Sequence, residues 1–450
     1  MRIDERTSAL VLPLALRLAG KPINPKLAEL LGNERLTASA LAELQWAKLT
    51  ALLAHCYECV PYYRRMFDEV GAHPSDIRTL AHYAKLPTTG KATLREVPDS
   101  LLSDRCRMNE LKVIRTGGST GVPVTVYQDE EYYCYGWDAF QRNMLWTGFT
   151  PGERQAWFTR PENSVASRRL RLALERKWVV GIGARSDKAF AEWAKGMLKH
   201  EPRFVHGHAV AIASLATYAL KHDIRFESVH QVMTTSETLT PQMREDIAEA
   251  FCAQVYSQYG CSEIYAIASE CSHGNMHVNS DMNLVEFVPI TKPGGIEAHE
   301  IVVTPLHAFA QPLVRFRPGD SADPIEGRCS CGLPFPIMGM VEGRVDDTLT
   351  FSGGTEVSSA MLERIVRAIP GVARFQFRQT SRDALQLLVV ADRRFTDQSL
   401  EKLRGTQEQF ALQAGIRIDI APVLVDEIEV LPNGKHQAVI RLEELARCLT

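Results

Sequence analysis

The sequence predicts an α/β protein: a large N-terminal domain of layered sheets and helices, joined by a hinge to a small C-terminal α+β domain. Three observations support this prediction. The chain has 450 residues, more than one ordinary domain. Between about residues 111 and 316, helical stretches alternate with short apolar stretches rich in β-branched residues, which is typical of helices covering sheets. A compact β/α unit of about 100 residues then follows, which fits a small second domain.

The N-terminal region is expected to be helical. Residues 9–20 are apolar, but Pro13 and Arg17 interrupt them, so they fit neither a signal peptide nor a membrane span. We interpret them as an arm packed on the body of the protein, with a membrane-surface contact as the alternative. Residues 36–56 predict a helix because their apolar positions recur about every 3.6 residues. The segment VPYYRRMF (60–67) then breaks and restarts the chain.

Strands and further helices are expected in the rest of the chain. Short apolar, β-rich segments of the large domain predict these strands: VTVY, RFVHGH, SVHQVMTTSE, AQVYSQYG, NLVEFV and HEIVVTPL. Beyond the boundary, a helix over 358–369 precedes two strands, one long helix (DQSLEKLRGTQEQFALQAG) and a last strand. We place the two domains at residues 1–342 and 343–450.

Composition narrows the class of protein. Apolar residues make up 45% of the chain and charged residues 23%, which is typical of soluble globular proteins. The net charge is −3, without an acidic or basic tail, so nucleic acid is not expected as a partner. Ten cysteines without a secretion signal predict reduced thiols and a cytoplasmic location.

One glycine-rich loop is the first candidate for a binding site. The stretch RTGGSTGVPVTVY (115–127) gathers small and hydroxyl-bearing residues between 116 and 121. It is not a Walker A loop, because it lacks the Gly-Lys-Ser/Thr ending and leads into a strand-like segment. Its backbone N–H groups and hydroxyls suit a phosphate nest, and a plain glycine turn is the alternative.

Four more motifs follow in order. They are YGCSE (259–263), VRFRPGD (314–320), GRVDD (343–347) and LPNGKHQAVI (431–440). Each of them alone fits an ordinary turn or a solvated charge. Their order along the chain is what favours a common function.

In this order the motifs resemble those of the adenylate-forming superfamily, which includes acyl-CoA synthetases, peptide-synthetase adenylation domains and luciferases. Within it, the chain resembles the phenylacetate–CoA ligase-like branch, and TGGSTG resembles the loop of its capsular-polysaccharide-associated members. The resemblance covers nearly the whole chain, from residue 60 to Lys435. It implies that ATP activates a small-molecule carboxylic acid as an acyl-adenylate, which is then transferred to a thiol, with CoA expected as the acceptor. Transfer to an amine or a carrier-protein thiol is the alternative, and a weakened nucleotide-binding scaffold is a third.

The resemblance also implies roles for individual residues. The nucleotide-binding residues would be Thr116, Gly117, Gly118, Ser119, Thr120, Gly121, Ser236, Glu237, Tyr259, Gly260, Ser262, Asp320 and Arg344. Among these, Tyr259 would stack on the adenine and Asp320 would bind the ribose. Glu263 would hold Mg²⁺, Asp346 would be the hinge, and Lys435 would bridge the carboxylate and the α-phosphate. For this branch a homodimer is expected.

The sequence departs from the family pattern at several positions. Val122 stands where many relatives have a lysine, and Ser262 replaces the usual threonine. Phe316 and Pro318 replace a tyrosine and a threonine. The missing lysine is expected to affect the speed of pyrophosphate release and not the type of reaction.

Two further clusters are candidates for sites. The resemblance implies a structural zinc site with four protein ligands, Cys271, His277, Cys329 and Cys331, and reduced thiols near a turn are the alternative. It also places an acid pocket near residues 203–216. The candidates for that pocket are Tyr135, Trp137, His206 and His208, with ordinary core packing as the alternative.

Overall fold

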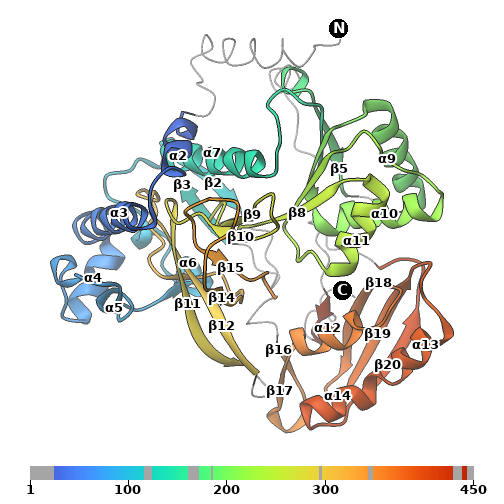
Figure 1. Ribbon diagram of the computed structural model, residues 1–450. Coiled ribbons are helices and arrows are strands. Elements are labelled where there is room, and N and C mark those ends of the chain that lie inside the picture. The colour runs from blue at the N-terminus through green and yellow to red at the C-terminus, as the bar shows by residue number, and fades with distance from the viewer. Residues whose placement is uncertain are drawn as a thin grey trace.

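The computed structural model describes residues 25–115, 124–160, 172–183, 186–292, 296–342, 348–428 and 438–442. Mixed sheets and helices make up the fold, so the predicted α/β class is confirmed (Figure 1). Within the described ranges, no helix is long and apolar enough to cross a membrane.

The N-terminal helices agree with the predicted pattern. Helix α3 (Ala38–Cys59) begins after Thr37, whose hydroxyl accepts a hydrogen bond from the Ala40 N–H. Pro61 then starts α4 (Pro61–Glu69), as the predicted break requires. The other short helices before the first long strands are α2 (Leu27–Asn33), η1 (Pro74–Asp76), α5 (Leu80–Tyr83), α6 (Lys91–Glu96), η2 (Asp99–Leu101) and η3 (Met108–Glu110).

A nine-stranded sheet forms the centre of the large part of the chain. Its order is β14-β15-β10-β9-β8-β7-β6-β4-β5, and its strands from β8 to β5 pair in parallel. The parallel strands are β4 (Gln155–Thr159), β5 (Lys177–Gly181), β6 (Phe204–His208), β7 (Gln231–Thr235) and β8 (Gln254–Tyr259). The antiparallel strands are β9 (Ala268–Glu270), β10 (Met276–Val278), β14 (Pro324–Ile325) and β15 (Ile337–Met338). Helices α9 (Asp187–His200), α10 (Ala209–Lys221) and α11 (Pro241–Phe251) connect β5 to β6, β6 to β7 and β7 to β8.

The inner parallel strands β4, β6, β7 and β8 are mostly buried because helices cover them, whereas the edge strand β5 is half-exposed. All residues of β6 are buried, and small side chains let the almost entirely buried α10 pack closely on the sheet. At Gly207 the backbone has φ of 151°, and a Cβ atom would lie 2.2 Å from the Phe158 carbonyl oxygen. Only glycine fits this close approach, which places the two flanking histidines at the end of the strand.

A second sheet and a hairpin complete the large unit, which we define as residues 25–342. The sheet has the order β1-β13-β12-β11, with β1 (Thr89–Gly90), β13 (Phe316–Arg317), β12 (Ile296–Pro305) and β11 (Asn283–Lys292). Strands β2 (Lys112–Arg115) and β3 (Thr125–Gln128) pair antiparallel and flank the glycine-rich loop, so the strand predicted after this loop is confirmed. Helix α7 (Glu130–Trp146) follows, capped by Asp129.

The small unit, which we define as residues 348–442, has a core of its own. Its strands are β16 (Thr348–Thr350), β17 (Glu356–Ser358), β18 (Val372–Ser381), β19 (Ala384–Ala391), β20 (Asp419–Leu424) and β21 (Val439–Ile440). Its helices are η4 (Ser352–Gly354), α12 (Ser359–Arg367), α13 (Asp397–Arg404) and α14 (Thr406–Ala414). The predicted single long helix is therefore wrong, because the chain divides it at Gly405.

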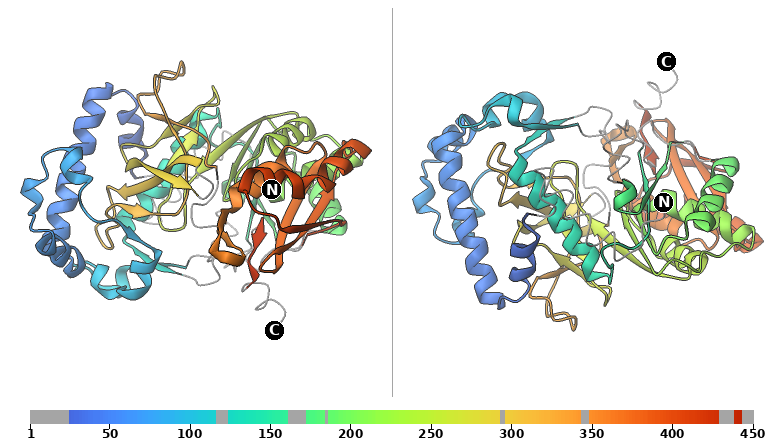
Figure 2. Two further views of the ribbon diagram at one scale, coloured as in Figure 1. Left: turned by 90° about the horizontal axis from the view of Figure 1, so that it is seen from below. Right: turned by 90° about the horizontal axis from the view of Figure 1, so that it is seen from above.

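The small unit lies next to α10 and α11 and far from α3 and α4 (Figures 1 and 2). Its hydrophobic cluster is built from residues between 349 and 439, and separate clusters fill the large unit. The expected boundary at residue 342 adjoins residues 343–347, which lie outside the described part of the chain. Its position stays a prediction.

Candidate functional site

The described nucleotide-binding candidates follow the carboxyl ends of strands, β7 and β8 in the nine-stranded sheet and β13 in the second sheet. In α/β sheets, ligands bind at this edge because loops there converge on one crevice. Ser236 and Glu237 follow β7, Tyr259 ends β8, and Glu263 lies in the turn that follows β8. Asp320 comes shortly after β13 of the second sheet.

Tyr259 and Asp320 are in direct contact. The Tyr259 hydroxyl donates a hydrogen bond to Asp320 Oδ2 over 2.9 Å, although 61 positions separate the two residues. The Tyr259 ring is largely buried in the main core cluster, so packing fixes its orientation. Gly260 follows, where a Cβ atom would lie only 3.1 Å from the Ala266 nitrogen. The structure thus brings together the two side chains that the resemblance assigns to adenine and ribose.

Glu263 is a buried carboxylate beside a lysine that sequence reasoning missed. The Glu263 side chain is 3% exposed, and Lys91 Nζ lies 3.9 Å from its Oε1. Lys91 Nζ also donates to the Pro318 carbonyl oxygen over 3.4 Å. Lys91 starts α6 directly after β1, and β1 pairs with β13, so the short parallel pairing places this cation at the site. Ser262, next to Glu263, is half-buried.

Ser236 and Glu237 follow β7, and the Glu237 side chain contacts the start of α10. Ser236 has φ of 74°, a left-handed conformation that is costly for a residue other than glycine. The Glu237 carboxylate accepts a hydrogen bond from His208 Nδ1 over 3.1 Å and another from the Val210 N–H over 3.4 Å. A carboxylate at a helix N-terminus is stabilised by the N–H groups exposed there. The structure therefore joins a predicted nucleotide residue, Glu237, to a predicted acid-pocket residue, His208.

The other acid-pocket candidates lie in two separate places. His206 packs between the rings of Phe140 and Trp157, with centroids 4.9 and 4.7 Å away. Its Nδ1 donates to the Met233 carbonyl oxygen over 3.0 Å, and burial lowers its pKa to about 3, so the imidazole is neutral. Trp137 is partly exposed and contacts Phe140, 5.7 Å between centroids. Phe140 and Trp157 are members of this aromatic cluster that sequence reasoning did not single out.

Tyr135 points away from that cluster. Its hydroxyl donates to Glu29 Oε2 on α2 over 2.7 Å, and its ring stacks on His307 with centroids 3.7 Å apart. Residues two positions apart on a helix project about 200° apart, so Tyr135 and Trp137 face different sides of α7. The structure does not bring Tyr135 together with the two histidines.

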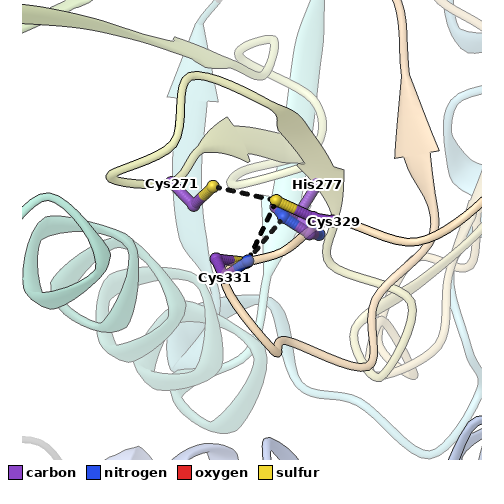
Figure 3. Close-up of side chains that lie close together, drawn as sticks. All are labelled: Cys271, His277, Cys329 and Cys331. Carbon is purple, nitrogen blue, oxygen red and sulfur yellow. Dashed lines mark hydrogen bonds between the residues drawn. The ribbon is translucent and has the colours of Figure 1, made fainter.

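The four predicted zinc ligands converge at one point (Figure 3). One ligand atom from each of Cys271, His277, Cys329 and Cys331 lies within 4.8 Å of all the others. The sulfurs of Cys271 and Cys329 are 3.7 Å apart, and Cys331 Sγ is 3.3 Å from His277 Nε2. Zn–S bonds of about 2.3 Å at tetrahedral angles require sulfurs about 3.8 Å apart, so the spacing fits zinc.

Surrounding groups orient these ligands. His277 Nδ1 donates to the Phe335 carbonyl oxygen over 2.9 Å, which leaves the lone pair of Nε2 facing the sulfurs. Burial lowers the pKa of His277, and a neutral imidazole is the form that binds a metal. The Asn275 amide donates to Cys329 Sγ over 3.2 Å. All four positions would be taken by protein atoms, so such a site is structural and has no open position for a substrate.

Several predicted residues lie outside the described part of the chain. These are Thr116, Gly117, Gly118, Ser119, Thr120, Gly121, Arg344, Asp346 and Lys435. Their roles stay predictions.

Comparison with known proteins now bears on the family. Residues 349–442 match the family model of the CapK C-terminal domain. The chain is 27% identical to a phenylacetate-coenzyme A ligase of Thermus thermophilus, over 75% of this chain and 78% of the relative. It is 23% identical to the protein CapK of Staphylococcus aureus, over 80% and 81%.

A solved structure shares the fold along the chain. A 2-hydroxyisobutyryl-CoA ligase in the postadenylation state, in complex with R3-HIB-AMP, has a TM-score of 0.72 at 19% identity and covers 94% of this chain and 93% of its own. The resemblance to phenylacetate–CoA ligases and CapK is confirmed by the sequence relatives, and the shared fold agrees with it. Other states of that ligase give lower TM-scores, 0.60 for an open conformation with 2-HIB-AMP and CoA and 0.59 for the thioesterification state. These cover 91% and 94% of this chain and 93% and 94% of their own, at 19% and 20% identity.

Proposed function

We propose that the protein is an AMP-forming acid–thiol ligase, which activates a carboxylic acid with ATP as an acyl-adenylate and transfers the acyl group to CoA. One observation carries the proposal. Tyr259 and Glu263, at and after the end of β8, meet the segment of Asp320 after β13 through a direct hydrogen bond and through Lys91, in a fold shared with adenylate-forming ligases. The coenzyme A ligases among the sequence relatives, aligned over three quarters of the chain, support the same conclusion.

The described residues suit the first half-reaction. Attack of a carboxylate on the α-phosphate of ATP expels pyrophosphate and builds negative charge on phosphate oxygens, so positioning and electrostatics dominate the catalysis. Tyr259 would hold the adenine and Asp320 the ribose hydroxyls, which fixes the α-phosphate relative to the acid. Glu263 would hold Mg²⁺, which neutralises part of the phosphate charge, and a buried carboxylate oxygen is a ligand type that this ion prefers.

Lys91 is the basic residue that the described part of the site offers close to Glu263. The glycine-rich loop carries Val122 where relatives have a lysine, so this loop brings no ammonium group at that position. Lys91 Nζ contacts both Glu263 and the chain that leads to Asp320. We infer that Lys91 orients the Glu263 carboxylate and contributes positive charge near the phosphates.

The second half-reaction would require the small unit to move. The resemblance assigns adenylation to Lys435, on the small unit, and rotation of that unit to a hinge at Asp346. Lys435 and the glycine-rich loop are far apart in sequence. The adenylating site would therefore be complete only when the small unit brings Lys435 to the loop. The acid would enter beside the aromatic cluster of Trp137, Phe140, Trp157 and His206, next to the His208–Glu237 pair.

The cysteine cluster is proposed to bind one structural zinc ion. The fit of the sulfur spacing and the orientation of His277 support this assignment. We further propose a cytoplasmic homodimer with domains at residues 1–342 and 343–450.

A different acceptor is the second candidate. The small unit, which would contact the acceptor in the second half-reaction, matches the CapK C-terminal domain. This match favours keeping an amine or a carrier-protein thiol as the alternative to CoA.

The experiment is ATP–pyrophosphate exchange with a panel of aryl and alkyl acids. We expect exchange with at least one acid, and trapping with CoA or with hydroxylamine then identifies the type of acceptor. A protein that binds ATP but exchanges pyrophosphate with no acid would refute the proposal and leave a nucleotide-binding scaffold.

A further inference from the structure

Two arginines connect the small unit to the helix between two site-bearing strands. Arg393 and Arg394 lie in the turn between β19 and α13. Arg394 donates to Asp246 Oδ1 over 2.6 Å, and Arg393 donates to Glu249 Oε1 over 2.7 Å. Asp246 and Glu249 belong to α11, which joins β7 to β8 and so lies between Glu237 and Tyr259 along the chain.

The arginine-bearing turn is fixed to the core of its own unit. The Asp392 N–H donates to the Gly371 carbonyl oxygen over 2.8 Å, and Phe395 packs against the small-unit core. At Gly371, with φ of 80°, a Cβ atom would lie 2.2 Å from the Phe395 nitrogen, so only glycine allows this packing. Asp392 also accepts hydrogen bonds from the Arg394 N–H and guanidinium, 2.7 and 2.6 Å. The guanidinium is therefore oriented before it meets α11.

The two ion pairs differ in exposure. The Asp246 side chain is 5% exposed, and burial raises its pKa while Arg394 opposes that rise. A buried carboxylate that lost its guanidinium partner would be left poorly compensated. Glu249 and Arg393 are 42% and 48% exposed, so water and salt screen their attraction.

The contact is polar and incompletely packed, which suits an interface that must open. A cavity of about 220 Å³ lies beside the ion pairs, between α10, α11 and the arginine turn. An apolar interface of matching shape would hold the units together more permanently. The arrangement of this chain is nearer to the postadenylation state of the hydroxyisobutyryl ligase than to its thioesterification state, with TM-scores of 0.72 and 0.59.

We propose that the ion pairs Arg394–Asp246 and Arg393–Glu249 form an interdomain latch that holds the small unit away from the thioesterification pose. Both arginines are then positioning residues that hold the pose preceding acyl transfer, and the latch opens before the second half-reaction. This inference rests on the proposed function. It goes beyond it by naming the contacts that set the balance between the two poses.

The first test compares the two half-reactions in Arg394→Gln and Asp246→Asn. Each variant removes one charge and keeps most of the shape. We expect the ratio of adenylate formation to thioester formation from pre-made acyl-adenylate to fall about 10-fold, the scale of one charged hydrogen bond. Arg394→Lys should restore part of the ratio. Arg404→Gln, at an exposed position of α13 on the same unit, is the matched control and should leave the ratio unchanged.

The second test measures the pose without any substrate. Dyes are attached through unnatural amino acids at the exposed positions Leu198 of α9 and Leu412 of α14. Energy transfer between them should report one main population in the parent protein and a second population in Arg394→Gln. If Arg394→Gln does not fold, Arg393→Gln at the half-exposed pair is used in both tests.

The outcomes separate the latch from the proposed function. Unchanged energy transfer, or equal slowing of both half-reactions, overturns the latch. A parent protein that activates no acid overturns the proposed function, and energy transfer then still decides whether these arginines hold the two units together.

Discussion

Replacing one ligand of the cysteine cluster should remove zinc and lower the stability of the large unit. The perturbation is Cys331→Ser, because the side chain is half-exposed and serine fills nearly the same volume. In the parent protein Cys331 Sγ lies 3.3 Å from His277 Nε2, so its loss opens one corner of the tetrahedron. We expect one zinc ion per chain in the parent protein and a small fraction of that in the variant.

The size of the effect follows from the number of ligands. Structural zinc contributes about 10–16 kcal/mol to folding in small peptides, so one of four ligands corresponds to about 3 kcal/mol. A unit of about 320 residues unfolds with an entropy of about 0.7 kcal/mol per degree, which converts that loss to a decrease of about 4 °C in Tm. The change is modest because a large core also supports the hairpin of β9 and β10, which carries Cys271 and His277.

The assay is elemental analysis combined with thermal unfolding of both proteins. Cys252→Ser is the matched control, because this cysteine is exposed and lies outside the cluster. It should leave both the zinc content and the Tm unchanged. A parent protein that contains no zinc and has free thiols at these positions would refute the reasoning, as would a Cys331→Ser protein that keeps one zinc and the parent Tm.

Four further predictions concern the site and its surroundings. Asp320→Ala should weaken ATP binding by about 2–3 kcal/mol, because a charged hydrogen-bonding group is lost. An ATP affinity that calorimetry finds unchanged in this variant would contradict the assignment. Lys435→Ala should slow adenylate formation at least ~10²-fold and leave thioester formation nearly normal, whereas Asp346→Pro should show the reverse in single-turnover kinetics. Equal slowing of both steps by Lys435→Ala would make it a general anion contact. Lys91→Ala should slow adenylation about 10-fold or more, and a rate equal to that of the parent protein would exclude Lys91 from the phosphate site. Burial raises the pKa of Asp138 from 3.8 to about 6. Between these values the folded protein keeps a proton that the unfolded chain releases. Ionisation of Asp138 therefore lowers the free energy of unfolding as pH rises from about 4 to about 6. Between pH 4 and pH 7, the free energy of unfolding of Asp138→Asn should rise by about 1–3 kcal/mol relative to that of the parent protein, as measured by denaturant titrations. Parallel plots of unfolding free energy against pH for the two proteins would contradict this.

The sequence was sufficient for most of the fold because local pattern and tertiary environment agree there. In the segment RFVHGH, residues 204–208 form a strand buried at every position, as a parallel strand should be. Where one long helix was expected near the C-terminus, the chain forms two helices divided at Gly405. An isolated glycine costs a helix only about 1 kcal/mol, so the pattern alone could not decide between one helix and two.

The site was predictable where residue type restricts the chemistry and less so where contacts are tertiary. Three cysteines and a histidine suggested a metal, and they converge, but only the resemblance had connected Cys271 to Cys331 across 60 positions. His206 satisfies its Nδ1 with a carbonyl oxygen in the core, which is the ordinary alternative that its sequence context left open. Helical geometry could have separated Tyr135 from Trp137 in advance. Lys91 carried no such signal, because a lysine at a helix start is usually solvated and only the pairing of β1 with β13 brings it to Glu263.

The zinc cluster and the latch are both connected to β8, the strand that ends in Tyr259. The cluster is connected through Glu270, and the latch through α11. Glu270 immediately precedes Cys271 and accepts a hydrogen bond from the Ser257 N–H of β8 over 2.6 Å. Arg244 of α11 binds both oxygens of the Glu270 carboxylate, at 2.8 and 3.0 Å. Helix α11, the metal-binding hairpin and the strand that ends in Tyr259 are thus joined by one buried carboxylate.

This connection fixes the position of Tyr259, the proposed adenine contact, while the small unit is proposed to move. A latch on α11 can then release the small unit without displacing Tyr259, because Glu270 holds the helix to the sheet independently of Arg394. Loss of the metal would act differently, because it would loosen the metal-binding hairpin next to Glu270. Since Glu270 is bonded to β8, the position of Tyr259 would then change. The Michaelis constant for ATP should therefore respond to Cys331→Ser and remain nearly constant in Arg394→Gln, whose effect would lie in the balance of the two half-reactions.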